Sequence, residues 1–459
     1  MQSFKPYEIY KESNISWLGQ VPAHWLIDRA KWSVQDCKNG FWGTEPEGEE
    51  DIVCVRVADF DRKSKTVSLD SLTLRNIAPK DRNARLLKEG DLLLEKSGGG
   101  DKQLVGAVVS FNHNFPAVTS NFVAKMSVDK SCNARFLTYI HSHFYDGFVN
   151  YRSIKQTTGI QNLDSQQYLD ERMSYPPLEE QQKIADFLDF KAAQIDALIA
   201  KKEALLLKLQ EKRSALITQA VTKGIHPNVG MKSSGVEWLG DVPAHWETFS
   251  LRHTLIEPLS NGLFKKKDQW GSGSRIVDVF DIYVDGDVID ESSLQRVDCS
   301  EFELEKYSAL HGDFFFVRSS LKLDGIGKSA LVSKPQEKMV FECHLVRGRP
   351  DLQKVDPKFY IYLLNSQYCR QILVALSNQV TMTTLDQEKF KGLKVPLPPK
   401  NEQEIITKYL DEKTSAIDKQ LIRTEEVIFK LQEYRSSLIT NTVTGKIDVR
   451  DFVVPNMPS

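Results

Sequence analysis

The chain has 459 residues, of which 41% are hydrophobic and 27% are charged, and its formal net charge is −2. This composition is typical of globular domains, and the length predicts about three of them. It excludes a uniformly polycationic nucleic-acid binder but permits local basic surfaces. Six scattered cysteines without a CxxC pair indicate reduced thiols. Because neither an apolar leader nor a long apolar run is present, we expect a cytoplasmic protein without a membrane span.

A nine-residue segment near the start of the chain occurs twice. Trp17–Trp25 reads WLGQVPAHW, and Trp238–Trp246, 221 residues later, reads WLGDVPAHW. A repeat of this kind takes precedence over other sequence signals, and it indicates a tandem duplication. We interpret 1–25 as the first copy of a repeated frame. The histidine of each copy stands between Ala and Trp, which favours a packing role over a chemical one.

The frame is followed by an insert, 26–175, whose texture is that of a mixed domain. Short β-branched and aromatic runs at 51–57, 91–95 and 105–109 predict strands, and 134–145 predicts an amphipathic helix. Gly, Asn and Asp separate these runs, as expected for turns. The insert is therefore predicted to be an α+β domain.

A long helix is predicted next, within 176–224. It begins after the double proline Pro176-Pro177, has glutamates in its first turn, and contains neither Pro nor Gly before Gly224. Steps of three and four residues predict a coiled-coil seam over four heptads, about 66 Å of helix. The apolar seam positions are Leu188, Ile195, Leu198, Leu205, Leu209 and Leu216.

The second half repeats this order with a shift of about 222 residues. A linker and second frame at 225–246 lead into an insert at 247–397, a long helix at 398–446 and a tail at 447–459. The second seam is predicted at Leu410, Ile417, Val427, Leu431, Tyr434 and Leu438. The two inserts are far less alike than the segments around them, so one scaffold is predicted to present two different surfaces. Each seam needs a partner helix, and the other copy in the chain is the nearest.

This combination of motifs resembles the specificity subunit of type I restriction-modification systems. The resemblance rests on the WLG–VPAHW frames, the PP–EQ segments, and the endings Arg213–Thr218 and Arg435–Thr440, which read RSALIT and RSSLIT. It covers the whole chain. One departure occurs after the helices, where Lys223-Gly224 in the first copy stands against Gly445-Lys446 in the second.

The resemblance implies a fold and a set of partners. It implies two mixed α/β target recognition domains, separated and joined by two long antiparallel coiled-coil helices in a pseudo-two-fold arrangement. Each domain would read one half of a split site in double-stranded DNA, and the helices would set the half-site spacing. Two methyltransferase subunits would dock on the helices, and restriction subunits would join the full complex.

Candidate DNA contacts are polar and basic residues in loops beside predicted strands, because such residues bind phosphates and base edges. In the first insert they are Lys96, Ser97, Lys102, Arg152, Lys155, Gln161 and Asn162. In the second insert they are Lys265, Lys266, Lys267, Arg318, Ser319, Lys322 and Thr383. The alternative for all of them is an ordinary hairpin or a solvated charge.

Motifs for catalysis and cofactor binding do not match. Gly325–Ser329 reads GIGKS, but the phosphate-binding loop requires a glycine where Lys322 stands. His141, His143 and the Cys343-His344 pair lack companions at zinc spacing. We therefore expect no cofactor or metal in this chain, with S-adenosylmethionine, ATP and Mg²⁺ bound by partner subunits. Two alternatives remain: a methyltransferase or nuclease with its own active site, and a coiled-coil scaffold with protein-binding inserts.

Overall fold

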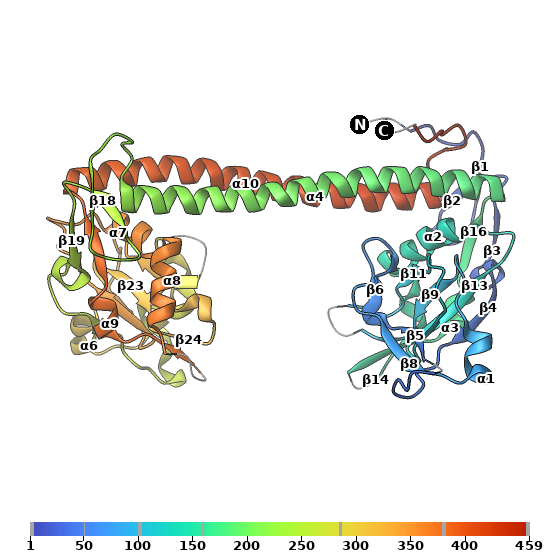
Figure 1. Cartoon of the computed structure of the whole chain (residues 1–459), viewed down its shortest axis with the longest axis horizontal. Coiled ribbons are helices and arrows are strands. Elements are labelled where there is room, and N and C mark those ends of the chain that lie inside the picture. The colour runs from blue at the N-terminus through green and yellow to red at the C-terminus, as the bar shows by residue number, and fades with distance from the viewer. Residues whose placement is uncertain are drawn as a thin grey trace. The chain divides into compact units, whose positions relative to one another are not determined.

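The structure is a computed structural model that describes residues 4–49, 51–99, 103–157, 159–283, 287–378 and 382–455 (Figure 1). The chain forms two compact units. Unit 1 combines Met1–Lys202 with Val427–Ser459, and unit 2 is Glu203–Glu426. The first frame therefore belongs to the same unit as the end of the chain. No helix in the described residues is long and apolar enough to cross a membrane.

Unit 1 contains a mixed domain built on a six-stranded sheet in the order β4-β13-β9-β11-β7-β6. Its strands are β4 (Val34–Asn39), β6 (Phe60–Asp61), β7 (Thr66–Val67), β9 (Leu92–Glu95), β11 (Val108–Ser110) and β13 (Val123–Val128). All neighbours are antiparallel except β7 and β11. Leu92, Leu93 and Leu94 on β9 are fully buried, so the predicted run at 91–95 forms the centre of the sheet.

Two smaller sheets complete this domain. The order β12-β5-β8 joins β5 (Asp51–Val55), β8 (Thr73–Asn76) and β12 (Ala117–Thr119), and the order β10-β15-β14 joins β10 (Ser97–Gly98), β14 (Ile154–Thr157) and β15 (Ile160–Leu163). The remaining elements are β1 (Tyr10–Glu12), β2 (Gln20–Pro22), β3 (Leu26–Arg29), β16 (Arg172–Tyr175), α1 (Pro79–Arg82), α2 (Ala134–Asp146) and α3 (Ser165–Leu169). Strand β3 pairs with β16, so both ends of the insert meet where the long helix begins.

Unit 2 contains the second mixed domain, with the related sheet order β20-β27-β23-β25. These strands are β20 (Ser260–Asn261), β23 (Phe314–Val317), β25 (Ser329–Leu331) and β27 (Leu345–Gly348). Beside them lie the order β22-β21-β26, from β21 (Trp270–Val277), β22 (Gln295–Val297) and β26 (Met339–Phe341), and the pair β24 (Ser319–Ser320) with β28 (Thr383–Thr384). The other elements are β17 (Met231–Ser233), β18 (Asp241–Pro243), β19 (Glu247–Ser250), β29 (Lys394–Leu397), α5 (Val279–Tyr283), α6 (Glu301–Lys306), α7 (Pro357–Leu364), α8 (Gln367–Leu376) and α9 (Gln387–Lys391).

The two predicted long helices are α4 (Leu178–Lys223) and α10 (Lys400–Val443). In unit 1 the beginning of α4 packs beside the end of α10, where Leu188, Ile195 and Leu438 share one hydrophobic core. In unit 2 the end of α4 packs beside the beginning of α10, and Ile217 and Leu410 share another core. The helices are thus antiparallel within each unit, as expected.

The register of the helix contact differs from the predicted seam at every second position. Leu198 and Leu205 are 41% and 40% exposed, so their assignment to the seam is wrong. The neighbouring Ile199 is only 2% exposed and takes the inward position in the core of unit 1. Leu209 and Ile417 are buried as predicted, whereas Leu216, Val427, Leu431 and Tyr434 are half-buried.

Candidate nucleic-acid interface

The repeated frame is fastened to the first turn of each long helix by a glutamate. In unit 1 the carboxylate of Glu180 accepts hydrogen bonds from Tyr7 Oη and from Trp25 Nε1 (3.0 Å), and it contacts His24 Nε2 at 2.8 Å. In unit 2 Glu402 contacts His245 Nε2 at 2.7 Å. The histidines therefore anchor the frame, as their position between Ala and Trp predicted.

The glutamine that follows each glutamate fastens the helix to the recognition domain. Gln181 Oε1 accepts from the backbone N–H of Asn133, the N-cap residue of α2, at 2.8 Å. Gln403 Oε1 accepts from the backbone N–H of Asp356, the N-cap residue of α7, also at 2.8 Å. Each glutamine also donates to the first carbonyl of its own double proline. The PP–EQ motif thus holds the long helix and the domain in one rigid arrangement.

The lysines that follow the long helices are equivalent, although the sequence alignment places them one residue apart. Lys223 Nζ donates to the carbonyls of Leu239 and Asp241 in the second frame. Lys446 Nζ donates to the carbonyls of Leu18 and Gln20 in the first frame. The end of the chain therefore completes the first frame in the same way that the end of α4 completes the second.

In the first domain the structure brings together four of the predicted DNA contacts on the sheet β10-β15-β14. Asn162 is paired with both Ser97 and Lys155 across this sheet, and Ser97 Oγ donates to Asn162 Oδ1 at 2.7 Å. Lys96 Nζ reaches Asn39 Oδ1 at 2.6 Å. We call Lys96, Ser97, Lys155 and Asn162 the first edge. In Figure 1, β14 lies on the side of its domain away from α4.

The other three predictions for the first domain have different outcomes. Gln161 is 4% exposed, and its Oε1 accepts from the backbone N–H of Val105, so it is a structural residue. Arg152 is exposed on the turn before β14, apart from the paired residues of the first edge. Lys102 lies outside the described residues.

A basic cavity beside the first edge escaped sequence reasoning. It has a volume of about 560 Å³, and Lys38, Asn39, Arg85 and Lys96 are among its lining residues. Arg85 stacks over the Phe41 ring at 5.7 Å and donates to the carbonyl of Asn39. Lys38 and Arg85 come from segments far from Lys96 in the sequence, so only the fold gathers their charges. The Asn39-Gly40 motif shared by both inserts was the available signal.

The second domain forms the corresponding edge from the pair β24-β28. Ser319 and Ser320 pair with Thr384 and Thr383, in the position that β10 and β15 occupy in the first domain. We call Arg318, Ser319 and Lys322 the second edge. Thr383 belongs to the pairing but is 8% exposed, so it supports the edge rather than presenting a side chain.

The predicted basic loop of the second insert is divided by the fold. Lys265 has a side chain that is only 5% exposed and forms an ion pair with Glu303 at 2.9 Å. This hydrogen bond holds the pKa of Glu303 below its usual value. Lys265 is therefore unsuited to contact DNA, whereas Lys266 and Lys267 are exposed.

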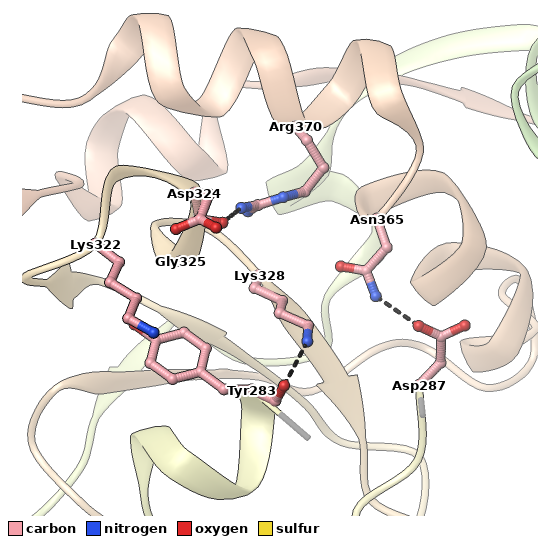
Figure 2. A pocket seen from close by; sticks show the side chains of 8 residues that line it. All are labelled: Tyr283, Asp287, Lys322, Asp324, Gly325, Lys328, Asn365 and Arg370. Carbon is pink, nitrogen blue, oxygen red and sulfur yellow. Dashed lines mark hydrogen bonds between the residues drawn. The ribbon is translucent and has the colours of Figure 1, made fainter. Parts of the chain in front are cut away.

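The Gly325–Ser329 loop does not form a phosphate cradle. Gly327 and Lys328 donate their backbone N–H groups to the carbonyls of Val317 and Gly325, and Ser329 donates to Asn365 Oδ1. Figure 2 shows the neighbouring cavity of about 410 Å³, where Lys328 donates to the Tyr283 carbonyl and Asn365 to Asp287. Burial raises the pKa of Asp287 in this cavity. These contacts use the loop for packing.

One group of candidate metal ligands occurs in the described residues. Glu342, Cys343 and His344 place their ligand atoms within 4.8 Å of one another. His344 Nδ1 is 2.8 Å from Glu342 Oε2, and burial raises the pKa of the Cys343 thiol. Glu342 is thus a companion to Cys343-His344 that zinc-spacing rules did not indicate.

Two divergent α/β domains on an internally repeated pair of long helices define a class of proteins that present two different surfaces on one scaffold. A family model described as the type I restriction modification DNA specificity domain matches residues 60–208 and 299–425. These matches cover more than half of the chain, so the chain belongs to this family.

Individual relatives agree with this assignment. The chain is 22% identical over 372 residues to the type I restriction enzyme EcoKI specificity subunit of Escherichia coli strain K12, covering 78% of this chain and 75% of that protein. A chain from a structure described as a type I R-M system in complex assembly and conformational transition has a TM-score of 0.70 at 13% identity, covering 92% and 98% of the two chains. The HsdS subunit from Thermoanaerobacter tengcongensis has a TM-score of 0.54 at 14% identity, covering 93% and 98%. These two structures share the fold.

Proposed function

We propose that this chain is the DNA sequence-recognition subunit of a type I restriction-modification complex and that each domain binds one half of a bipartite, asymmetric site. The observation that carries this proposal is the pair of edges. Their strand pairing is the same in the two domains, but their side chains differ, with Lys96 and Asn162 in one and Arg318 and Lys322 in the other. Two unlike readers are what an asymmetric split site requires.

The long helices would set the distance between half-sites and dock two methyltransferase subunits, with restriction subunits joining the full complex. Support comes from apolar side chains on their outer faces. Leu207 on α4 is 63% exposed, and Ile422 and Phe429 on α10 are 57% and 60% exposed. Exposed apolar residues clustered in this way are typical of protein interfaces.

Catalysis would belong to the partner subunits, which would bind S-adenosylmethionine, ATP and Mg²⁺. The GIGKS loop supports this division of labour, because its backbone donors are engaged within the domain. The role of this chain would then be to position the partners' active sites on a chosen sequence.

The test is a selection from duplex libraries with two randomised blocks and a variable spacer. The full chain is assembled with its methyltransferase subunits, and the salt concentration is fixed because phosphate contacts depend strongly on it. We expect enrichment of one bipartite sequence at one spacer length. Affinity independent of sequence would overturn the proposal and favour a scaffold role. Binding of S-adenosylmethionine by the isolated chain would instead favour an enzyme with its own active site.

A charge-matched pair of variants locates the interface. Lys96→Gln removes a cation from the first edge, at the start of β13, whereas Lys130→Gln removes an exposed cation beyond the other end of β13. Lys96→Gln should weaken DNA binding several-fold and reduce its salt dependence, and Lys130→Gln should do neither. Equal effects of the two variants would argue against the first edge as the interface.

A further inference from the structure

A three-residue turn stands at the same place in both domains, directly beside each edge. In the first domain Ser120, Asn121 and Phe122 connect β12 to β13, and in the second Glu342, Cys343 and His344 connect β26 to β27. Lys96 N donates to the Phe122 carbonyl at 2.8 Å, and Arg318 N donates to the His344 carbonyl at 2.9 Å. The third residue of each turn is therefore bonded to the first residue of the edge.

The backbones of these turns follow the same hydrogen-bond pattern. The first residue of the turn donates its N–H to Val55 in one domain and to Val277 in the other. The residue after the turn donates back to the first residue in both domains, at 3.0 Å from Val123 to Ser120 and at 3.1 Å from Leu345 to Glu342. The two turns thus hold equivalent residues in equivalent positions.

A glycine fixes each turn from the opposite side. A Cβ on Gly40 would lie 2.1 Å from the Thr119 carbonyl oxygen, and a Cβ on Gly262 would lie 2.2 Å from the Glu342 carbonyl oxygen. Only glycine allows such a close approach of two backbones. The Asn-Gly pair that the inserts share is therefore explained by support of the turn, and the turn cannot shift to accommodate its own side chains.

The side chains on this common backbone have different chemistry. Phe122 is 57% exposed beside Lys96 and Ser97, although large aromatic rings are normally buried. His344 has a side chain that is 45% exposed, and its Nδ1 donates to the Glu342 carboxylate. Because a carboxylate only accepts hydrogen bonds, Nδ1 carries the proton and Nε2 remains an acceptor.

We propose that Phe122 and His344 are specificity-determining residues that each read a base pair in the half-site of their own domain. This inference rests on the proposed function. An exposed phenyl ring can contact a thymine methyl group or insert at a base step, and the Nε2 acceptor of His344 matches the amino group of adenine or cytosine. The same position would thus select different base pairs in the two half-sites.

The test uses the library selection with the full chain and its methyltransferase subunits. Phe122→Ala should lower the preference at one base pair of the first half-site by about tenfold and leave the second half-site unchanged. His344→Ala should do the reverse, and His344→Gln, which keeps an acceptor, should retain more of the preference. Trp32→Ala is the matched control, because Trp32 is 61% exposed on the turn between β3 and β4, near the strand pair that leads into α4.

The outcomes separate this inference from the proposed function. If the unaltered chain selects a bipartite sequence and both alanine variants select the same sequence with the same stringency, the turns do not read bases and the inference is wrong. If the unaltered chain selects no sequence, the proposed function fails first. If Trp32→Ala relaxes the half-site as much as Phe122→Ala, a general loss of domain order is responsible and the inference is also overturned.

Discussion

Arg435 on α10 and Asp196 on α4 form an ion pair whose Nε–Oδ1 distance is 3.0 Å in unit 1. Their counterparts 222 residues away, Arg213 and Asp418, form the same pair in unit 2 with donor and acceptor exchanged between the helices, at 2.8 Å. The contact between antiparallel helices is therefore written twice. Arg435 belongs to the RSSLIT ending, which gives that motif a physical role.

These two ion pairs should differ in strength. Arg435 and Asp196 are 17% and 29% exposed, whereas Arg213 and Asp418 are 35% and 43% exposed, so solvent screens the second pair more. Double-mutant cycles with alanine should give a coupling energy of about 1 kcal/mol for the first pair and less for the second. Thermal denaturation of the four variants of each cycle measures this. A larger coupling in the Arg213–Asp418 cycle would contradict the argument.

Removal of the frame glutamates should also be unequal. Glu180 has three side-chain partners, and Glu180→Gln replaces one accepting oxygen with a donor, which should cost about 1–3 kcal/mol. Glu402 has His245 as its partner, and Trp246 Nε1 has no hydrogen-bond partner among the described residues. Glu402→Gln should therefore cost less. Melting temperatures of the two variants provide the comparison, and equal shifts would argue against the asymmetry.

Acidification should destabilise unit 1 through His141. Burial lowers the pKa of His141 from 6.5 to about 4, and Tyr168 Oη lies 2.7 Å from its Nδ1. The unfolded chain therefore binds this proton before the folded chain does, so the contribution to stability is complete above pH 6.5 and is lost as the pH falls towards 4. His141→Gln, which can still accept from Tyr168, should flatten the dependence of stability on pH in that window. An unchanged slope in denaturant titrations would refute this assignment.

A change in helix length tests the proposed spacing role. Insertion of seven residues after Lys202 in α4 and after Glu426 in α10 preserves the heptad phase and adds about 10 Å of helix to each. We expect the preferred spacer to lengthen by about three base pairs while both half-sites stay the same. Library selection reads out spacer and half-sites together. Altered half-site bases with an unchanged spacer would exclude the helices as the measure of distance.

Much of the architecture was accessible from sequence because its signals are local. The frames, the double prolines and the glycines after each helix lie close to the boundaries they mark, and the runs at 51–57 and 91–95 correspond to β5 and β9. Candidate contacts were harder to predict. The edge strands placed Ser97 beside Asn162, but Gln161 is turned inward, because alternation along a strand gives adjacent residues opposite faces.

The sequence by itself determined that the chain is duplicated, that two long helices carry two unlike domains, and where each part begins. It could do so because repeats, helix breakers and hydrophobic period act over short distances. The tertiary structure decided which phase of the heptad faces inward, with Ile199 rather than Leu198 buried, because that choice depends on the partner helix. It also decided that Lys265 is spent on Glu303 while Phe122 stays exposed, because the fate of a side chain depends on neighbours far along the chain.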